Sequence, residues 1–288
     1  MSRFSRAKQF ILSLLVALSI VSFSNGLRYV RAEDSPPQCD ESNIAALASR
    51  TIDIQGKSER LKRIDELLAG CAGVGGPDAE LALLRLMNAK AELIRGRARL
   101  TLLDGIIERH ANKDPGTLSD EIRVERAKAI LKRIGGWRDN SPKVPLLEKV
   151  IREESGSKSV NNRYQAFRAR LELAALESDN ETQMQSYQSI LDDIEKDPDA
   201  RAHRFIAGSA LLRLARREAP ENRIARYDEV VTRFENDRDA DLQALAFRAK
   251  WLKARLVHAP ARMGILTKLV EEYKDRAEIG RRSLSRRY

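Results

Sequence analysis

The chain has 288 residues, of which 33% are charged and only 5% are aromatic, and its formal net charge is +10. This composition excludes a collagen and a disordered chain, and nothing in it favours a β-sandwich. The length suits either two globular domains or one long array of repeats, so the order of the elements has to decide between them.

Residues 1–32 are typical of an export signal. The first eight residues carry three basic side chains and no acid, and an apolar run over 10–23 follows them. Such a run is short for a bilayer core of about 30 Å and is characteristic of a secretory signal peptide. Two cleavage positions compete, after Ala32 and after Ser24, and a retained N-terminal anchor is the alternative. We therefore expect the remaining chain to be exported, to a periplasm or to the medium, with membrane contact only through an uncleaved signal.

Export changes the charge of the working chain. Residues 1–32 hold five basic and no acidic side chains, so their removal lowers the net charge from +10 to about +5. A mildly basic chain gives no overall signal for nucleic acid, and we expect no nucleic-acid partner.

The only two cysteines lie near the start of the exported chain. Cys39 is in the polar segment 33–41, and Cys71 ends the first copy of a repeated helix pattern. In an oxidising compartment the two can form a disulfide that fastens the N-terminal turn to the array. The alternative is that Cys71 is simply a small apolar residue in its column. No histidine lies near either cysteine, and we expect no metal and no cofactor.

One helical pattern recurs six times. A pair of adjacent apolar residues returns every 39 to 44 residues, roughly, with a large apolar residue three positions before it and a weaker column four positions after its first member. Steps of three and four mark one face of a helix. The pairs are Leu67–Leu68, Ile106–Ile107, Val150–Ile151, Ile190–Leu191, Val230–Val231 and Leu269–Val270. The weaker column is Cys71, His110, Glu154, Ile194, Phe234 and Tyr273. We expect both members of a pair, for example Val230 and Val231, to be buried.

An alanine-rich segment precedes each of the last five copies. These segments lie at about 77–97, 117–134, 158–177, 199–217 and 239–257. Small residues allow two helices to approach closely, and proline after a capping Ser or Asp marks several junctions. The unit is therefore a helix pair, A then B, of about 40 residues, with the first A helix expected at 42–54. One pair cannot bury its apolar face, whereas stacked pairs can.

The stretch Tyr227–Asp237, YDEVVTRFEND, together with an alanine-rich partner helix, resembles the tetratricopeptide-repeat family. The resemblance covers most of 42–273, but the period is near 40 instead of about 34, and the full family signature is absent. A related α-solenoid is the alternative. The resemblance implies an all-α superhelix of about six helix pairs, whose A helices line a concave groove that holds a partner segment. We expect this repeat domain to span 42–278 and a basic tail to follow at 279–288.

Charge is unequal between the two kinds of segment. The A segments are basic, with a sum of about +11, whereas the B segments that follow them are neutral or acidic. If A helices line a groove, the groove is positive, and arginine in it can hold a carboxylate through two hydrogen bonds. The expected partner-binding cations are Arg123, Arg126, Arg163, Arg170, Arg204, Arg213, Lys250 and Lys253. The alternative is that they pair with acids of neighbouring B helices or are solvated.

Signals for catalysis are weak. His110, His203 and His258 lie far apart, each expected at the surface or in packing, and neither H-E-x-x-H nor G-x-S-x-G occurs. We therefore expect a non-catalytic exported scaffold, not an enzyme, that binds a protein or peptide in the cell envelope, an acidic one if the groove recognises it. A structural protein that contacts anionic polymers or a membrane surface is the alternative, and an enzyme with a cryptic site is the weakest one.

Overall fold

The structure, a computed structural model, describes residues 39–136, 140 and 142–273. This part of the chain is all-α, with twelve α-helices and two short 3-10 helices. The expected export signal, the polar segment up to residue 38, Trp137 and the basic tail lie outside the described residues. Among the helices that are described, none combines the length and the apolar character needed to span a bilayer.

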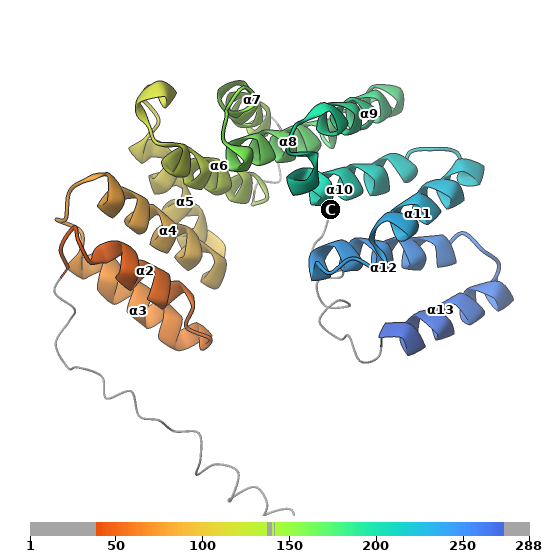
Figure 1. The fold of residues 1–288 in the computed structure, drawn as a ribbon, viewed down its shortest axis with the longest axis horizontal. Coiled ribbons are helices and arrows are strands. Elements are labelled where there is room, and N and C mark those ends of the chain that lie inside the picture. The colour runs from red at the N-terminus through yellow and green to blue at the C-terminus, as the bar shows by residue number, and fades with distance from the viewer. Residues whose placement is uncertain (1–38, 137–139, 141, 274–288) are drawn as a thin grey trace, which may run out of the picture. The chain divides into compact units, whose positions relative to one another are not determined.

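The twelve helices form six adjacent pairs, each with an A helix followed by a B helix (Figure 1). The pairs are α2 (Ile44–Ile52) with α3 (Lys57–Gly70), α4 (Pro77–Leu93) with α5 (Gly96–Arg109), α6 (Asp120–Ile134) with α7 (Lys143–Glu154), α8 (Val160–Ala174) with α9 (Asn180–Lys196), α10 (Arg204–Ala215) with α11 (Pro220–Phe234) and α12 (Ala240–Ala254) with α13 (Ala259–Tyr273). The 3-10 helices η1 (Pro115–Thr117) and η2 (Ala200–His203) precede α6 and α10. The expected all-α class and the pairing are confirmed.

Local side chains start several of these helices. The side chains of Ser119 and Asp179 accept hydrogen bonds from first-turn N–H groups of α6 and α9, which satisfies donors that have no partner within the helix. Pro77 and Pro220 stand in the first turns of α4 and α11, where a missing N–H costs nothing. The starts of these four helices therefore coincide with capping residues and prolines in the sequence.

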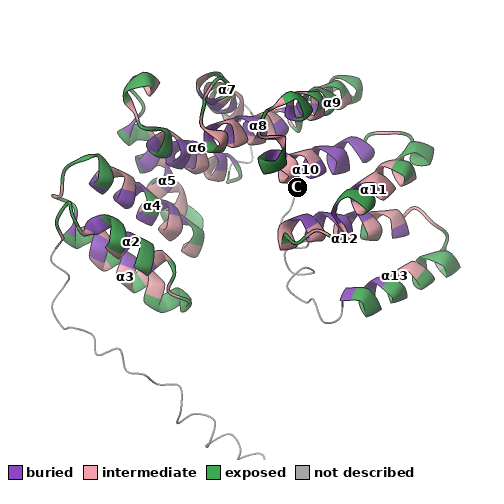
Figure 2. Cartoon of the chain, viewed as in Figure 1, coloured by how far each residue is buried: buried purple, intermediate pink, exposed green. Residues whose placement is uncertain are grey.

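Apolar clusters join each helix pair to the next one. From α4 onward, each A helix contacts its own B helix and both helices of the preceding pair. One cluster, for example, joins Leu211 of α10, Val230 and Phe234 of α11, and Leu245 and Ala246 of α12. In Figure 2 the A helices α6 and α10 are largely buried, whereas the B helix α13 is mostly exposed. This packing of successive pairs is consistent with a helical repeat.

The buried face of the B helices is rotated from the expected one. The first member of every apolar pair is buried, and so is the whole column four positions later, although it is the weaker one in sequence. The second member is only half-buried in the first five B helices and exposed in the sixth. Val230 is thus buried as expected, whereas the expectation that Val231 is buried too is wrong, because it is half-buried at the edge of the cluster.

Cys39 and Cys71 form a disulfide, with Cα atoms 5.3 Å apart. The bridge joins the residue before the first turn of α2 to the end of α3. Cys71 also packs in a cluster with Ile44, Ile64 and Leu67, so both roles considered for it from the sequence apply at once. Disulfides form and persist mainly in oxidising compartments.

Candidate functional site

All eight cations expected to bind a partner pair with a carboxylate of the chain itself. The pairs are Arg123 with Glu154, Arg126 with Glu153, Arg163 with Asp197 and Asp199, Arg170 with Asp193, Arg204 with Asp237, Arg213 with Glu172, Lys250 with Glu235 and Glu272, and Lys253 with Asp228. Arg213 reaches an acid of another A helix, and the other seven reach a B helix or the residues that follow one. These side chains therefore connect helices, and their contact with a partner stays a prediction.

One such contact fastens the first turn of α6 to the end of α7. Arg123 Nε and Nη2 donate to the Glu154 carboxylate at 3.3 and 2.7 Å, and Nη2 also donates to the Glu153 carbonyl oxygen at 2.6 Å. Glu154 is buried. Burial raises the pKa of the Glu154 carboxyl, and the hydrogen bonds and charge of Arg123 only partly oppose that effect. Arg123 is therefore the counter-ion that a buried carboxylate requires.

The same contact recurs at other pairs with different residues. Arg163 Nε donates to Asp197 Oδ2 at 2.8 Å, joining the start of α8 to the end of α9. In α4 and α5 the charges are reversed, because Glu80 lies at the start of α4 and accepts from Lys113 at 2.8 Å beside buried His110. Because the contact recurs with the acid on either helix, we infer that it holds the A helix to the B helix of its pair.

His203 is buried at the end of η2, where the ring of Phe167 lies 5.0 Å from its own ring centroid. Its Nε2 is 3.5 Å from Asp197 Oδ1, too far for a well-formed hydrogen bond, and within the described chain neither ring nitrogen has a hydrogen-bond partner. Burial lowers the pKa of His203; Asp197 raises it, and Arg163 lowers it further. His203 and His110 are thus packing histidines, and His258 is exposed.

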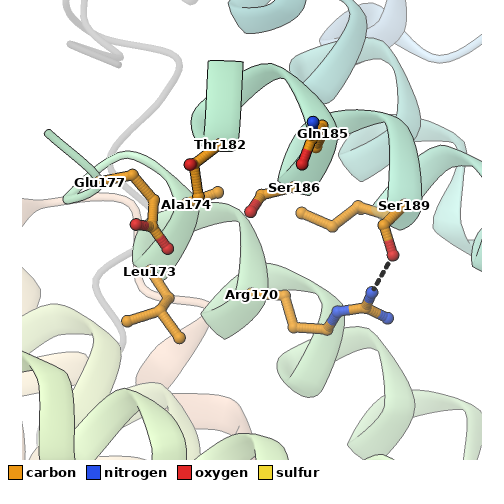
Figure 3. Close-up of a pocket in the computed structure, with 9 residues that line it drawn as sticks. Arg170, Leu173, Ala174, Glu177, Thr182, Gln185, Ser186 and Ser189 are labelled. Carbon is orange, nitrogen blue, oxygen red and sulfur yellow. Dashed lines mark hydrogen bonds between the residues drawn. The ribbon is translucent and has the colours of Figure 1, made fainter. Parts of the chain in front are cut away.

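A hollow of about 330 Å³ lies between α8 and α9 (Figure 3). Its walls are Arg170, Leu173 and Ala174 of α8, Glu177 of the connection, and Thr182, Gln185, Ser186, Ser189 and Ile190 of α9. Arg170 Nη2 donates to Ser189 Oγ at 3.2 Å and lies 2.7 Å from Asp193 Oδ2. In Figure 3 the Glu177 carboxylate and the Arg170–Ser189 contact lie on opposite sides of Ser186. The hollow therefore offers a cation, an anion and several hydroxyl and amide groups within a short span.

Across the described residues, neither Ser186 nor Ser189 has a hydrogen bond to a histidine that could act as its base. In the same residues, no group of three or more His, Cys, Asp or Glu side chains is arranged to hold a metal ion.

Sequence reasoning found one residue of this hollow, Arg170, and missed the face of α9 opposite it. A usable signal was present: Thr182, Gln185, Ser186 and Ser189 are polar at positions i, i+3, i+4 and i+7, which share one side of a helix. These four side chains carry no charge, so the charge pattern of the sequence does not single them out.

No family model, no curated protein and no solved structure matches this chain. The resemblance to tetratricopeptide repeats therefore rests on the residues that suggested it.

Proposed function

We propose that this chain is a non-catalytic, exported scaffold with a tetratricopeptide-like solenoid fold, and that it binds a segment of a partner protein in the hollow between α8 and α9. Three observations support the proposal: successive helix pairs that pack against one another, a disulfide of the kind found outside the cytoplasm, and a polar hollow on one pair.

The hollow is the main support for the proposal because it is lined by Arg170, one of the eight cations expected to bind a partner. The Arg170 side chain is 25% exposed and its partner Asp193 is 44% exposed. An ion pair so open to water contributes at most about 1 kcal/mol, so a carboxylate of the partner can replace Asp193 at little cost. Arg126, by contrast, is 2% exposed and already committed to Glu153.

The same hollow defines the partner segment. A carboxylate near Arg170 and a donor near Glu177 would meet complementary charges, and the backbone between them would meet the amide of Gln185 and the hydroxyl of Ser186. Charge-assisted hydrogen bonds of this kind fix orientation as well as affinity. We therefore expect a short extended peptide with an acidic side chain or a C-terminal carboxylate.

Site-specific photo-crosslinking tests the proposal. A photoreactive residue in place of Gln185, in the cells that make the protein, should capture a partner protein that the same residue in place of exposed Arg233 on α11 does not capture. Arg170→Glu should weaken the capture about tenfold by reversing the charge, and Ser186→Phe should block it by filling the hollow. Melting temperatures of both variants should stay close to that of the parent.

Capture of the same proteins from positions 185 and 233 would contradict the proposal. So would capture at position 185 that persists unchanged in both Arg170→Glu and Ser186→Phe, because the partner would then be bound by another surface.

A further inference from the structure

The last helix pair exposes apolar side chains at positions that earlier pairs cover. Within the described residues, the large hydrophobic side chains classed as exposed are Trp251 of α12 and Met263 and Val270 of α13, at 36%, 63% and 67%. All three belong to the pair α12/α13. Exposed apolar patches on a protein surface commonly mark interaction sites.

On α13 the exposure follows the repeat columns. Met263 takes the position that is half-buried in every earlier B helix, as Leu61, Leu100, Val144, Met184 and Ile224. Leu266 is half-buried, whereas its five equivalents are buried: Ile64, Leu103, Leu147, Tyr187 and Tyr227. Val270 likewise replaces half-buried residues of the first five B helices. One face of α13 is therefore uncovered relative to every other B helix.

On α12 the same comparison applies to Trp251. Counting back 40 residues at a time gives Leu211, Leu171 and Leu131, which are all buried. Leu211 of α10 lies in one cluster with Leu242 and Ala246 of α12, so the element that covers it is the next A helix. Trp251 and α13 thus present the surface against which the next A helix of an array would pack.

The helices that cover this surface elsewhere show what it accepts. Val231 of α11 packs against the cluster that holds Ala246 and Ala249 of α12. Ile190 of α9 shares a cluster with Ala210 of α10, and Val150 of α7 shares one with Ala169 of α8. In each case a helix with alanine on its buried side lies against the B helix.

Neither residues 274–288 nor an A helix of a second copy matches this chemistry well. Residues 274–288 contain one alanine and five arginines, whereas α12 alone contains five alanines. The alanine-rich faces of the described A helices are already buried within the chain. Because helices with alanine on the buried side cover the equivalent faces elsewhere, we take such a helix from another protein as the occupant.

We propose that Trp251, Met263, Leu266 and Val270, here called the end face, dock a helix of a different protein that carries small residues along the side in contact. The interface continues the one that the chain repeats internally, and it is separate from the hollow between α8 and α9. Burial of these side chains drives the association, and Trp and Met are residues enriched at protein interfaces.

A peptide with the sequence of residues 238–256, which contains α12, serves as the probe because α12 covers the equivalent face of α11. Fluorescence anisotropy with the full chain should show saturable binding below about 1 mM. Val270→Asp and Met263→Asp should each weaken it about tenfold or more, since each places a charge in an apolar contact. Thr232→Asp, at an exposed position of α11, is the matched control and should leave binding unchanged. The same peptide with Ala246→Leu and Ala249→Leu should bind poorly because it cannot approach closely.

Absence of saturation up to about 1 mM would overturn this proposal, as would binding that Val270→Asp leaves intact. Self-association in sedimentation equilibrium that Val270→Asp abolishes would overturn it in favour of a second copy. Binding that appears only after deletion of residues 274–288 would show that the chain covers its own end face. None of these results bears on the crosslink at Gln185, so the two proposals fail independently.

Discussion

The weaker column of the B helices, four positions after the first member of each apolar pair, is polar in one part of the molecule and apolar in another. In α5 and α7 it holds His110 and Glu154, whereas in α9 and α11 it holds Ile194 and Phe234, and all four side chains are buried. The backbone arrangement is the same in both regions, because each of these helices contacts its own A helix and the next one. The same buried position therefore holds a paired polar side chain in one region and an apolar side chain in the other.

The two solutions differ in what they depend on. Phe234 is stabilised by apolar contacts, and they are tight: a Cβ added at Gly208 of α10 would lie 2.7 Å from its ring. Glu154 depends on Arg123, because a buried charge without a counter-ion destabilises the folded chain. Replacing both members of such a pair by well-packed apolar residues often does not. Substitutions at each position can therefore test whether the polar and the apolar side chain are stabilised in these two different ways.

The largest effect is expected at the polar position. Arg123→Met should lower the free energy of unfolding by about 3–5 kcal/mol, because Glu154 is left buried without its counter-ion. The double variant Arg123→Met/Glu154→Met should come within about 1 kcal/mol of the parent. Urea denaturation at pH 7 measures both. Acidification should restore part of the loss in the single variant, because burial raises the pKa of Glu154 and protonation removes the buried charge.

Equal destabilisation by the single and double variants would contradict this account, since it would show that the loss comes from the packing of Arg123 and not from the charge left behind.

An intermediate effect is expected at the apolar position. Val230→Ala should cost about 1–3 kcal/mol in urea denaturation, because Val230 is fully buried in the cluster of α10, α11 and α12. Val231→Ala should cost roughly half as much, because its side chain is only half-buried. The two substitutions remove the same atoms one residue apart, so each serves as the control of the other. An equal loss at both positions would mean that Val231 is buried as well, as the sequence alone predicts.

The smallest effect concerns pH at His203. Its pKa in the folded chain is below the ordinary value of 6.5, so the unfolded chain binds the proton more readily. The stability that neutral His203 contributes is therefore complete above pH 6.5 and is lost as the pH falls below that value. Three charged groups act on this pKa: Asp197 and Asp199 raise it, and Arg163 lowers it.

Thermal melts from pH 7.5 to pH 5 measure this loss. His203→Phe should have a flatter profile than the parent over that range, because a phenyl ring takes up no proton. Asp197, whose pKa the hydrogen bonds of Arg163 hold below its usual value against the opposing effect of burial, should remain ionised throughout. Parallel profiles for parent and variant would show that His203 does not titrate in this window.

The sequence predicts the number, type and pairing of the helices because every pair repeats the same apolar and small residues at the same spacing. It misjudges the B-helix face because His110 and Glu154 are polar, and a polar residue in a column argues for exposure. Both can be buried because each has a polar partner about 30 positions away in the sequence: Glu80 for His110, and Arg123 for Glu154. A single sequence does not show which distant side chains meet.

The same limit applies to the candidate site. Arg163 and Arg170 are on the expected helices, but their acids lie on the following B helix or just beyond it, 34 residues away for Arg163 and Asp197. The polar face of α9 escapes notice for another reason. Its residues carry no charge, and only the opposing wall of α8, known from the fold, makes a hollow of them.

The disulfide has a mechanical consequence. Cys39 and Cys71 are 32 residues apart along the chain but covalently joined, so tension applied at the N-terminal side passes through the sulfur atoms directly to the end of α3. Helices α2 and α3 lie inside the closed loop and bear none of that tension. In a single-molecule pulling experiment they would add no length on rupture while oxidised, and reduction would release about 110 Å of extended chain at roughly 3.5 Å per residue.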